Sequence, residues 1–133
     1  MARITVWLFI EAADLTSEEI SARIGLPPDA SWRIGDLRGR TGKVYETNSW
    51  SLRSAMEVNE NPLVVGESVR ACLNGVLRRV RDNADRFKSA ASGQIAGLYI
   101  GITAVEPPAL ELKADEISTI SALGVDVEID LML

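Results

Sequence analysis

The chain of 133 residues contains no histidine and a single cysteine, Cys72. Histidine is the usual general base near neutral pH, the common partner of a serine or cysteine nucleophile and a frequent zinc ligand. Histidine-dependent triads and histidine-ligated metal centres are therefore excluded. One cysteine also excludes an internal disulfide and a multi-cysteine metal site. We expect a protein that is not an enzyme and that carries no metal and no cofactor.

Long apolar runs are missing too, since none approaches the roughly 20 residues that cross a membrane. The first residues, Met1-Ala2-Arg3, lead directly into a strand-like pattern without the features of a signal peptide. We therefore expect a cytoplasmic protein with no membrane partner. The composition, with 47% apolar and 25% charged residues, predicts a single globular domain over residues 1–133.

Charge is distributed unevenly along the chain. The formal net charge is −5, yet residues 33–88 carry eleven basic and seven acidic side chains, a balance of +4. A basic centre favours an anion or an acidic partner, and the alternative is a long helix with a solvated arginine-rich face. The acidic flanks repel a long polyanion, so we expect no nucleic-acid partner beyond a short contact with the middle.

A short motif occurs twice. Leu15–Ser21 returns as Leu112–Ser118, each time after a strand-like run and before a closing glycine, Gly25 or Gly124. Thr16 and Glu19 have the spacing of a capping box, and apolar residues flank the box at the positions of a hydrophobic staple. The second copy keeps the apolar pair, Leu112 and Ile117, but places a poor capping residue, Lys113, at the start of its helix.

The apolar spacing predicts the remaining elements. We expect strands at Ile4–Ile10, Val44–Thr47, Ser49–Ala55, Ile95–Val105 and Val125–Leu133, and helices at Ser17–Ile24, from Pro62 to about Phe87, and at Ala114–Leu123. The order β-α-β-β-α-β-α-β predicts an α+β fold: a single two-layer sandwich with a ferredoxin-like core and an added C-terminal helix and strand.

Three details of that fold follow from the side-chain pattern. Thr5, Trp7 and Phe9 alternate with apolar residues, which predicts a central first strand covered on both faces. The last strand places its apolar residues on the core and Asp126, Glu128 and Asp130 in water. These three acids also have a spacing that suits a divalent cation, but an acidic solvent face has the same pattern. Cys72 lies on the apolar stripe of the long helix and is expected to be buried.

The segment from Trp32 to Lys43 is the best candidate site. Its three glycines free the backbone, and its basic side chains offer donors to phosphate or carboxylate. It lacks the Gly-Lys-Ser or Gly-Lys-Thr ending that leads from a phosphate-binding P-loop into a helix. The alternative interpretation of this segment is a flexible basic hairpin loop. Trp50 follows in a strand, where core packing is the alternative to ligand stacking. The candidate binding residues are Trp32, Arg33, Asp36, Arg38, Arg40, Lys43 and Trp50.

Several short motifs, spaced along most of the chain, resemble those of the small bacterial proteins grouped as domain of unknown function 4279. They are Leu15–Ile20, Ile24–Asp29, Gly35-Asp36, Asn48–Leu52 and Leu123–Asp130. Members of that family often carry a histidine near the start of the long helix, where this chain has Val64–Ser68 without one. The resemblance implies no activity. The small size is similar to that of bacterial immunity proteins, which act by binding a partner.

The sequence thus predicts a non-enzymatic binding module that acts through another protein, in the manner of an immunity protein. The long basic helix and the tryptophan-containing loop offer the contact surface, because Trp, Tyr and Arg are enriched at binding hot spots. The alternative is a small anionic ligand bound by the Trp32–Lys43 loop.

Overall fold

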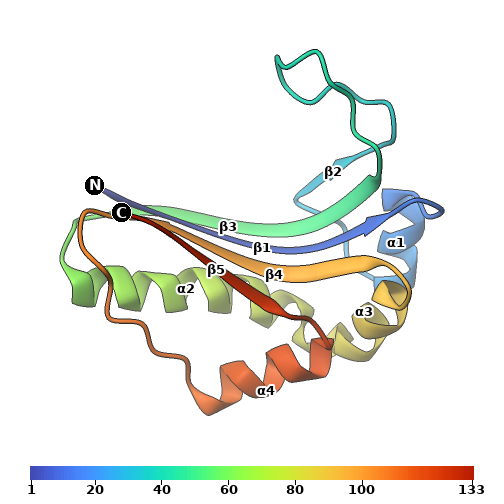
Figure 1. The fold of residues 1–133 in the computed structure, drawn as a ribbon. Coiled ribbons are helices and arrows are strands. Elements are labelled where there is room, and N and C mark those ends of the chain that lie inside the picture. Colours follow the sequence, from blue (N-terminus) through green and yellow to red (C-terminus); the bar gives the residue numbers. More distant parts are fainter.

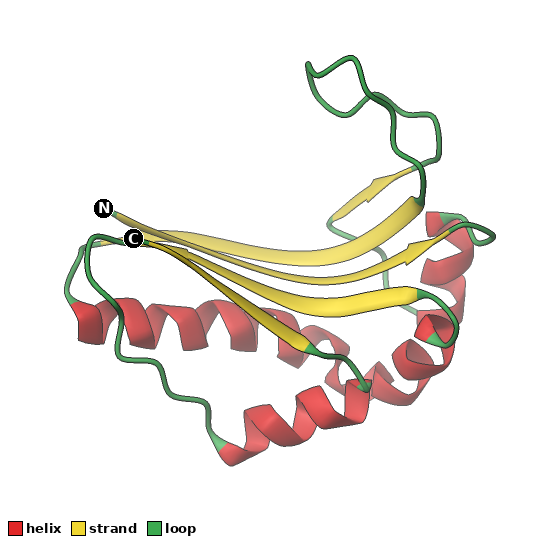
Figure 2. Ribbon diagram, viewed as in Figure 1, coloured by secondary structure: helices red, strands yellow, loops and turns green.

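The computed structural model describes residues 1–133 and shows an α+β fold on one mixed five-stranded sheet (Figure 2). Its strands lie in the order β2-β3-β1-β4-β5; the pairs from β2 to β4 are antiparallel and β5 is parallel to β4. The elements are β1 (Ala2–Ala12), α1 (Ser17–Ile24), β2 (Ala30–Trp32), β3 (Asn48–Val58), α2 (Pro62–Val80), a 3₁₀ turn (Arg81–Asn83), α3 (Ala84–Ala91), β4 (Ile95–Thr103), α4 (Ala114–Leu123) and β5 (Val127–Met132).

All helices lie on one face of the sheet (Figure 1). Every helical connection joins two parallel strands, and crossovers of this kind are right-handed. Strand β1 runs opposite to β3 and β4, and the connection that follows β1 also crosses the sheet in the opposite direction to the connections that follow β3 and β4. Right-handed crossovers therefore all lie on the same face of the sheet. The expectation that the first strand is covered on both faces is therefore wrong. Strand β1 is central, but Thr5, Trp7 and Phe9 point to the face without helices.

The two copies of the repeated motif begin helices α1 and α4. In α1 the Thr16 Oγ1 accepts from the Glu19 N–H at 3.2 Å, and Glu19 Oε1 accepts from the Thr16 N–H at 3.1 Å, which confirms the capping box. In α4 only the reverse bond forms, from the Lys113 N–H to Glu116. The second apolar pair does not close as a buried staple, because Ile117 is exposed. Gly25 and Gly124 end the helices with φ of 84° and 71°.

The predicted strand at Val44–Thr47 does not form. The strand beside β3 is instead β2, only three residues long, which pairs with Ser49–Ser51. Val44 makes a single isolated bridge to Leu37. A strand of three residues is too short to show an alternating pattern, so the side-chain pattern predicted the partner of β3 too late in the chain.

The predicted long helix is interrupted by the 3₁₀ turn, so the order of elements differs from the predicted one. Asn83 Nδ2 donates to the Ile24 carbonyl at 2.8 Å, and Arg86 donates to the carbonyls of Arg23 and Ala22 at 2.8 and 3.0 Å. These bonds satisfy the last carbonyl groups of α1. The bend therefore turns α3 toward the end of α1 while Phe87 stays in the core.

Strand β5 is less buried than its pattern suggests. Val127, Ile129 and Leu131 are 37%, 46% and 43% exposed, so the prediction that they belong to the core is wrong. The strand lies at the edge of the sheet, and α4 packs against α2 and α3 instead of covering it.

A buried carboxylate joins α4 to α2. Glu116 is 2% exposed and accepts from Arg70 Nε at 3.1 Å, from Asn74 Nδ2 at 2.6 Å and from the Lys113 N–H at 2.6 Å. Burial alone raises the pKa of Glu116. The hydrogen bonds from Arg70, Lys113 and Asn74 outweigh burial and hold that pKa below its ordinary value.

We expect Glu116→Gln to lower the free energy of unfolding by about 2–3 kcal/mol at pH 7, because the charge on Arg70 loses its partner. The pKa of Glu116 is lower in the folded state, so this stabilisation is full above the unfolded pKa of about 4.3 and is lost as pH falls through the folded pKa. Urea unfolding of both proteins between pH 7 and pH 3 measures the difference.

Glu67→Gln, which changes an exposed carboxylate on α2, the helix that carries Arg70, is the control and leaves the curve unchanged. A difference between Glu116→Gln and wild type that stays constant down to pH 3 contradicts the assignment of a lowered pKa.

Two glycines of α2 meet different surroundings. A Cβ on Gly66 would lie 1.9 Å from the Ala109 carbonyl oxygen, because the segment between β4 and α4 crosses the helix there. The Ala109 N–H donates to the Pro62 carbonyl at 3.2 Å and holds this crossing in place. A Cβ on Gly75 would lie 3.5 Å from Ser54 Oγ, an ordinary contact.

These surroundings predict opposite signs for the same substitution. Gly75→Ala raises the free energy of unfolding by up to about 1 kcal/mol through helix propensity, whereas Gly66→Ala lowers it because the crossing segment must move. Denaturant unfolding of the two variants beside wild type provides the comparison. Equal stabilisation by both alanines is the result that rules out the close approach at Gly66.

Candidate functional site

The face of the sheet without helices, which we call the open face, carries most of the aromatic side chains. Side chains from β1, β3 and their neighbours form three rows across it, as the strand register requires. From the β2 side these rows are Trp32, Ser49 and Glu11; then Ser51, Phe9 and Gly97; then Arg53, Trp7 and Tyr99.

Arg53, Trp7 and Tyr99 form a row of contacting side chains, which we call the first stack, with 41° between the planes of the Trp7 and Tyr99 rings. The Arg53 guanidinium carbon lies 4.3 Å from the Trp7 ring centre, and the Trp7 and Tyr99 rings lie 5.6 Å apart. The Tyr99 hydroxyl donates to Asp130 Oδ2 at 3.1 Å. Desolvation and this neighbouring carboxylate both raise the pKa of Tyr99. Gly101 provides the space beside the ring, because a Cβ there would lie 2.9 Å from the phenol.

Residues 33–47 form a hairpin, which we call the arm. The arm rises from the sheet beyond β2 on the side of the open face (Figure 1). Backbone bonds of 2.9 Å close it: the Gly35 N–H to the Tyr45 carbonyl, the Tyr45 N–H to the Asp36 carbonyl, and the Arg38 N–H to the Lys43 carbonyl. The arm thus has the hairpin form of the alternative interpretation of this segment, and its backbone pairing is the part that the sequence did not predict.

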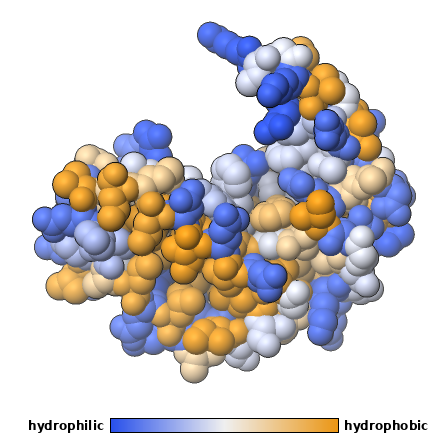
Figure 3. All heavy atoms as spheres, in the orientation of Figure 1, coloured by the Kyte–Doolittle hydropathy of each residue, from blue (hydrophilic) through white to orange (hydrophobic).

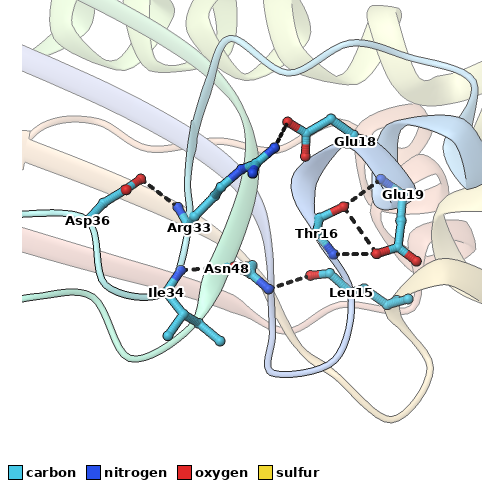
Figure 4. A network of polar contacts seen from close by, with 8 residues as sticks. All are labelled: Leu15, Thr16, Glu18, Glu19, Arg33, Ile34, Asp36 and Asn48. Carbon is cyan, nitrogen blue, oxygen red and sulfur yellow. Dashed lines mark hydrogen bonds and ion pairs between the residues drawn. The ribbon is translucent and has the colours of Figure 1, made fainter.

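A polar network fixes the base of the arm (Figure 4). Asn48, which is buried, donates to the Leu15 carbonyl and accepts from the Ile34 N–H, both at 2.9 Å. Arg33 Nη2 donates to Glu18 Oε1 at 2.8 Å, and Asp36 accepts from the Arg33 N–H at 2.8 Å. The arm is therefore tied to the start of α1 as well as to β3.

A second stack joins the arm to the sheet. The Trp32 and Tyr45 rings lie 4.1 Å apart with 12° between their planes, and Arg38 lies 5.3 Å from the Tyr45 ring centre. Each stack thus pairs two aromatic rings with one guanidinium group. Such contacts fix the positions of side chains that would otherwise be mobile on an exposed surface.

Between the two stacks lies a concave space with a volume of about 1000 Å³, which we call the groove. Trp7, Glu11 and Arg53 line it from the sheet, and Arg38, Lys43 and Tyr45 are among the residues that line it from the arm. Figure 3 shows the molecular surface hollowed beside the arm. A smaller cavity of about 200 Å³ lies next to it over Phe9, Trp7 and Trp32.

The family model described as Domain of unknown function (DUF4279) matches residues 2–133. The chain belongs to this family. No curated protein and no solved structure matches it.

In this DUF4279 protein, the motifs that carried the resemblance have structural roles. Thr16 and Glu19 cap α1, Asn48 anchors the arm, Trp50 fills the core and Gly124 ends α4. The aromatic residues of the groove lie outside these motifs. The roles of these motifs therefore lie in the frame, and the groove is interpreted from its own geometry.

The structure brings together some of the predicted site residues and separates others. Trp32, Arg38 and Lys43 line the groove, and Arg33 and Asp36 hold the base of the arm. Arg40 is exposed in the turn of the arm and makes no hydrogen bond or ion pair.

Trp50 is the exception among the predicted site residues. It is fully buried on the helix side, where its Nε1 donates to the Leu26 carbonyl at 3.2 Å and its ring lies 6.0 Å from that of Phe87. The core alternative is the correct interpretation of Trp50. Its position one residue away from Ser49 and Ser51 on the strand places it on the opposite face from the groove.

The prediction missed Tyr45 of the arm and the residues that the sheet contributes to the groove and the smaller cavity: Trp7, Phe9, Glu11, Ser49, Arg53 and Tyr99. A signal for several of them was present. Trp7, Phe9 and Tyr99 alternate with the core residues of their strands, and helices on one face leave such positions uncovered.

Three of the five arginines between Pro62 and Phe87 have partners within the chain, whereas Arg78 and Arg81 make no hydrogen bond or ion pair. Arg70 forms an ion pair with Glu116. Arg79 forms a bidentate ion pair with Asp29, with N–O distances of 2.6 and 2.9 Å. The hydrogen bonds from Arg79 hold the pKa of Asp29 below its ordinary value. Together with Arg86, which binds the end of α1, these side chains hold the helix layer together. The basic helix thus offers less free charge than its sequence indicates.

This DUF4279 protein has few groups that could bind a metal ion or act as a nucleophile. No group of three or more acidic or cysteine side chains is arranged to hold a metal ion. Cys72 is buried as predicted, and burial raises the pKa of its thiol, which disfavours the nucleophilic thiolate. No helix has both the length and the apolar character required to cross a membrane.

Proposed function

We propose that this DUF4279 protein is a non-enzymatic binding module that binds another protein through the groove. The observation that carries this proposal is the concentration of aromatic and arginine side chains on a sheet face that no helix covers. Trp, Tyr and Arg dominate the binding energy of protein interfaces, and the groove contains Trp7, Trp32, Tyr45, Arg38 and Arg53.

Two further features support a protein partner. The two stacks hold their rings before binding, and an ordered surface loses less conformational entropy when a partner arrives. The charges are mixed, since Glu11 and Glu46 lie among Arg38, Lys43 and Arg53. A partner with charges of both signs complements such a surface better than one with a single sign.

The same proposal includes the finer description of the fold and its setting. The order β2-β3-β1-β4, with helices between parallel β1 and β2 and between parallel β3 and β4, supports a ferredoxin-like unit extended by α4 and β5. We place the protein in the bacterial cytoplasm, with a role like that of an immunity protein. A toxin gene beside its own gene is the observation that supports this role most directly.

We expect Trp7→Ala and Arg53→Ala each to weaken partner binding by about 30-fold or more, the loss typical of a hot spot. The partner is captured from the native cell with the wild-type protein, identified by mass spectrometry and purified. Calorimetric titration then gives Kd for wild type and variants.

Arg81→Ala is the matched control, because Arg81 is an exposed arginine on the helix side and should leave Kd unchanged. Circular dichroism verifies that all variants are folded. A partner whose Kd changes with Arg81→Ala but not with Trp7→Ala or Arg53→Ala binds the helix side, and this refutes the proposed surface.

A second candidate is a small anionic ligand in the groove. The observation that favours it is local charge: Arg38, Lys43 and Arg53 line the groove of a chain whose net charge is −5. Guanidinium and ammonium groups on an ordered surface are the usual donors to phosphate and carboxylate. Trp32 and Tyr45 would then cover an apolar part of the ligand.

Thermal-shift measurements with phosphate, dicarboxylates and nucleotides test this candidate. A ligand of the groove raises the melting temperature of wild type and fails to raise that of an Arg38→Ala, Lys43→Ala double variant. Arg40→Ala, which removes a charge at the turn of the arm outside the groove, keeps the full shift. A shift that survives the double variant locates the anion elsewhere and eliminates the candidate.

A further inference from the structure

The small cavity next to the groove, which we call the inner pocket, is built differently from the groove. Its volume of about 200 Å³ is below the range of drug-sized ligand sites, so it accommodates a single ring or a group of similar size. Phe9 forms its floor and lies over Gly97, where a Cβ would approach the ring to 3.0 Å. Trp7 and Trp32 also line it.

Two residues that line this pocket each hold a buried polar atom without a hydrogen-bond partner: Trp32 Nε1 and Ser49 Oγ. Ser49 is only 1% exposed, and both side chains line the pocket. A buried donor without a partner destabilises a fold, and such groups are rare in native proteins outside functional sites. They are the only two side-chain atoms of this kind in the protein.

The two donors lie beside an acceptor. Trp32 pairs with Ser49 across β2 and β3, and Ser49 pairs with Glu11 across β3 and β1. Neighbouring strands are about 4.8 Å apart, so the three side chains form a short row. The indole N–H can only donate, and an ionised carboxylate can only accept. The row therefore presents two donors followed by an acceptor.

We propose that the inner pocket binds a planar ring that carries an amide, with its carbonyl oxygen next to an N–H. The carbonyl oxygen accepts from Trp32 Nε1 and Ser49 Oγ, and the amide N–H donates to Glu11. The ring lies over Phe9, with an aromatic wall at Trp7. A carboxylate of the same shape is rejected, because it has no donor for Glu11 and repels that side chain.

This inference goes beyond the proposed function, since it concerns a small molecule and needs no protein partner. Its test uses nicotinamide as the amide and benzoate as the carboxylate of similar size. The indole N–H signals in a two-dimensional NMR spectrum of the whole protein report binding, and the signal of Trp32 is assigned from its loss in Trp32→Phe.

We expect nicotinamide to shift the Trp32 indole signal and to bind at least tenfold more tightly than benzoate. Ser49→Ala and Trp32→Phe should each weaken nicotinamide at least fivefold, because each removes one donor and keeps the pocket. Glu11→Gln should reduce the preference for nicotinamide over benzoate, since the repulsion is removed.

A stability measurement separates a ligand site from an ordinary part of the fold. Ser49→Ala removes an unpaired hydroxyl, so the free protein should unfold at a higher temperature than wild type while its affinity for nicotinamide falls. Ser51→Ala is the comparison on the same face: its hydroxyl is paired with the Ala30 carbonyl and with Arg53, so its loss should lower the melting temperature.

Three results overturn the inference: benzoate binding as tightly as nicotinamide, an affinity for nicotinamide that Ser49→Ala and Trp32→Phe leave unchanged, or no shift of the Trp32 indole signal at millimolar nicotinamide. None of them affects the proposed protein partner, whose test depends on Trp7 and Arg53 and on a different measurement.

Discussion

The burial of one side of β1 is the constraint on which the rest of the molecule depends. Ile4, Val6, Leu8 and Ile10 are fully buried against the helix layer, and they can be so only because each connection between parallel strands returns over the same face. That arrangement gives one large core and removes a large apolar area from water. It also leaves the alternate side chains of β1 without cover, so the groove is the other side of the same strand. The aromatic stacks and their glycine neighbours are how the protein keeps this uncovered face ordered.

The ordering of the groove and the stability of the helix layer are connected through polar contacts. Asp29 at the start of β2 binds Arg79 of α2 and accepts from the Arg53 backbone N–H at 2.7 Å. The arginine whose guanidinium covers Trp7 is thus positioned at its backbone by a carboxylate that also holds the helix layer. Asn48 has a corresponding role for the arm, since it joins β3, the arm and the segment before α1. The groove is thus supported from beneath by Asp29, Arg79 and Asn48, none of which lines it.

Features that depend on neighbours in sequence could be predicted. The capping box at Thr16, the glycine ends of α1 and α4, the stripe of α2 and the burial of Cys72 all follow from local spacing and match the structure. Features that depend on distant contacts could not. The short strand β2 exists because Trp32 pairs with Ser49, and the helix bends at Asn83 because the end of α1 needs donors. Trp32, Arg38 and Lys43 of the candidate loop line the groove, but Trp7 and Arg53, which line it from the sheet, could be placed there only once the position of the helices was known.

The strand order also has a consequence for how the chain folds. The central strand β1 is made first, yet its neighbours are β3 and β4, whose paired residues reach Val58 and Thr103. During synthesis β1 therefore has no complete set of partners until most of the chain has left the ribosome. Pairings between residues so far apart in sequence slow folding, because the loops between them must close before the contacts form. The nascent protein thus carries an incompletely paired apolar strand until β4 emerges, a state in which chaperones and competing association have time to act.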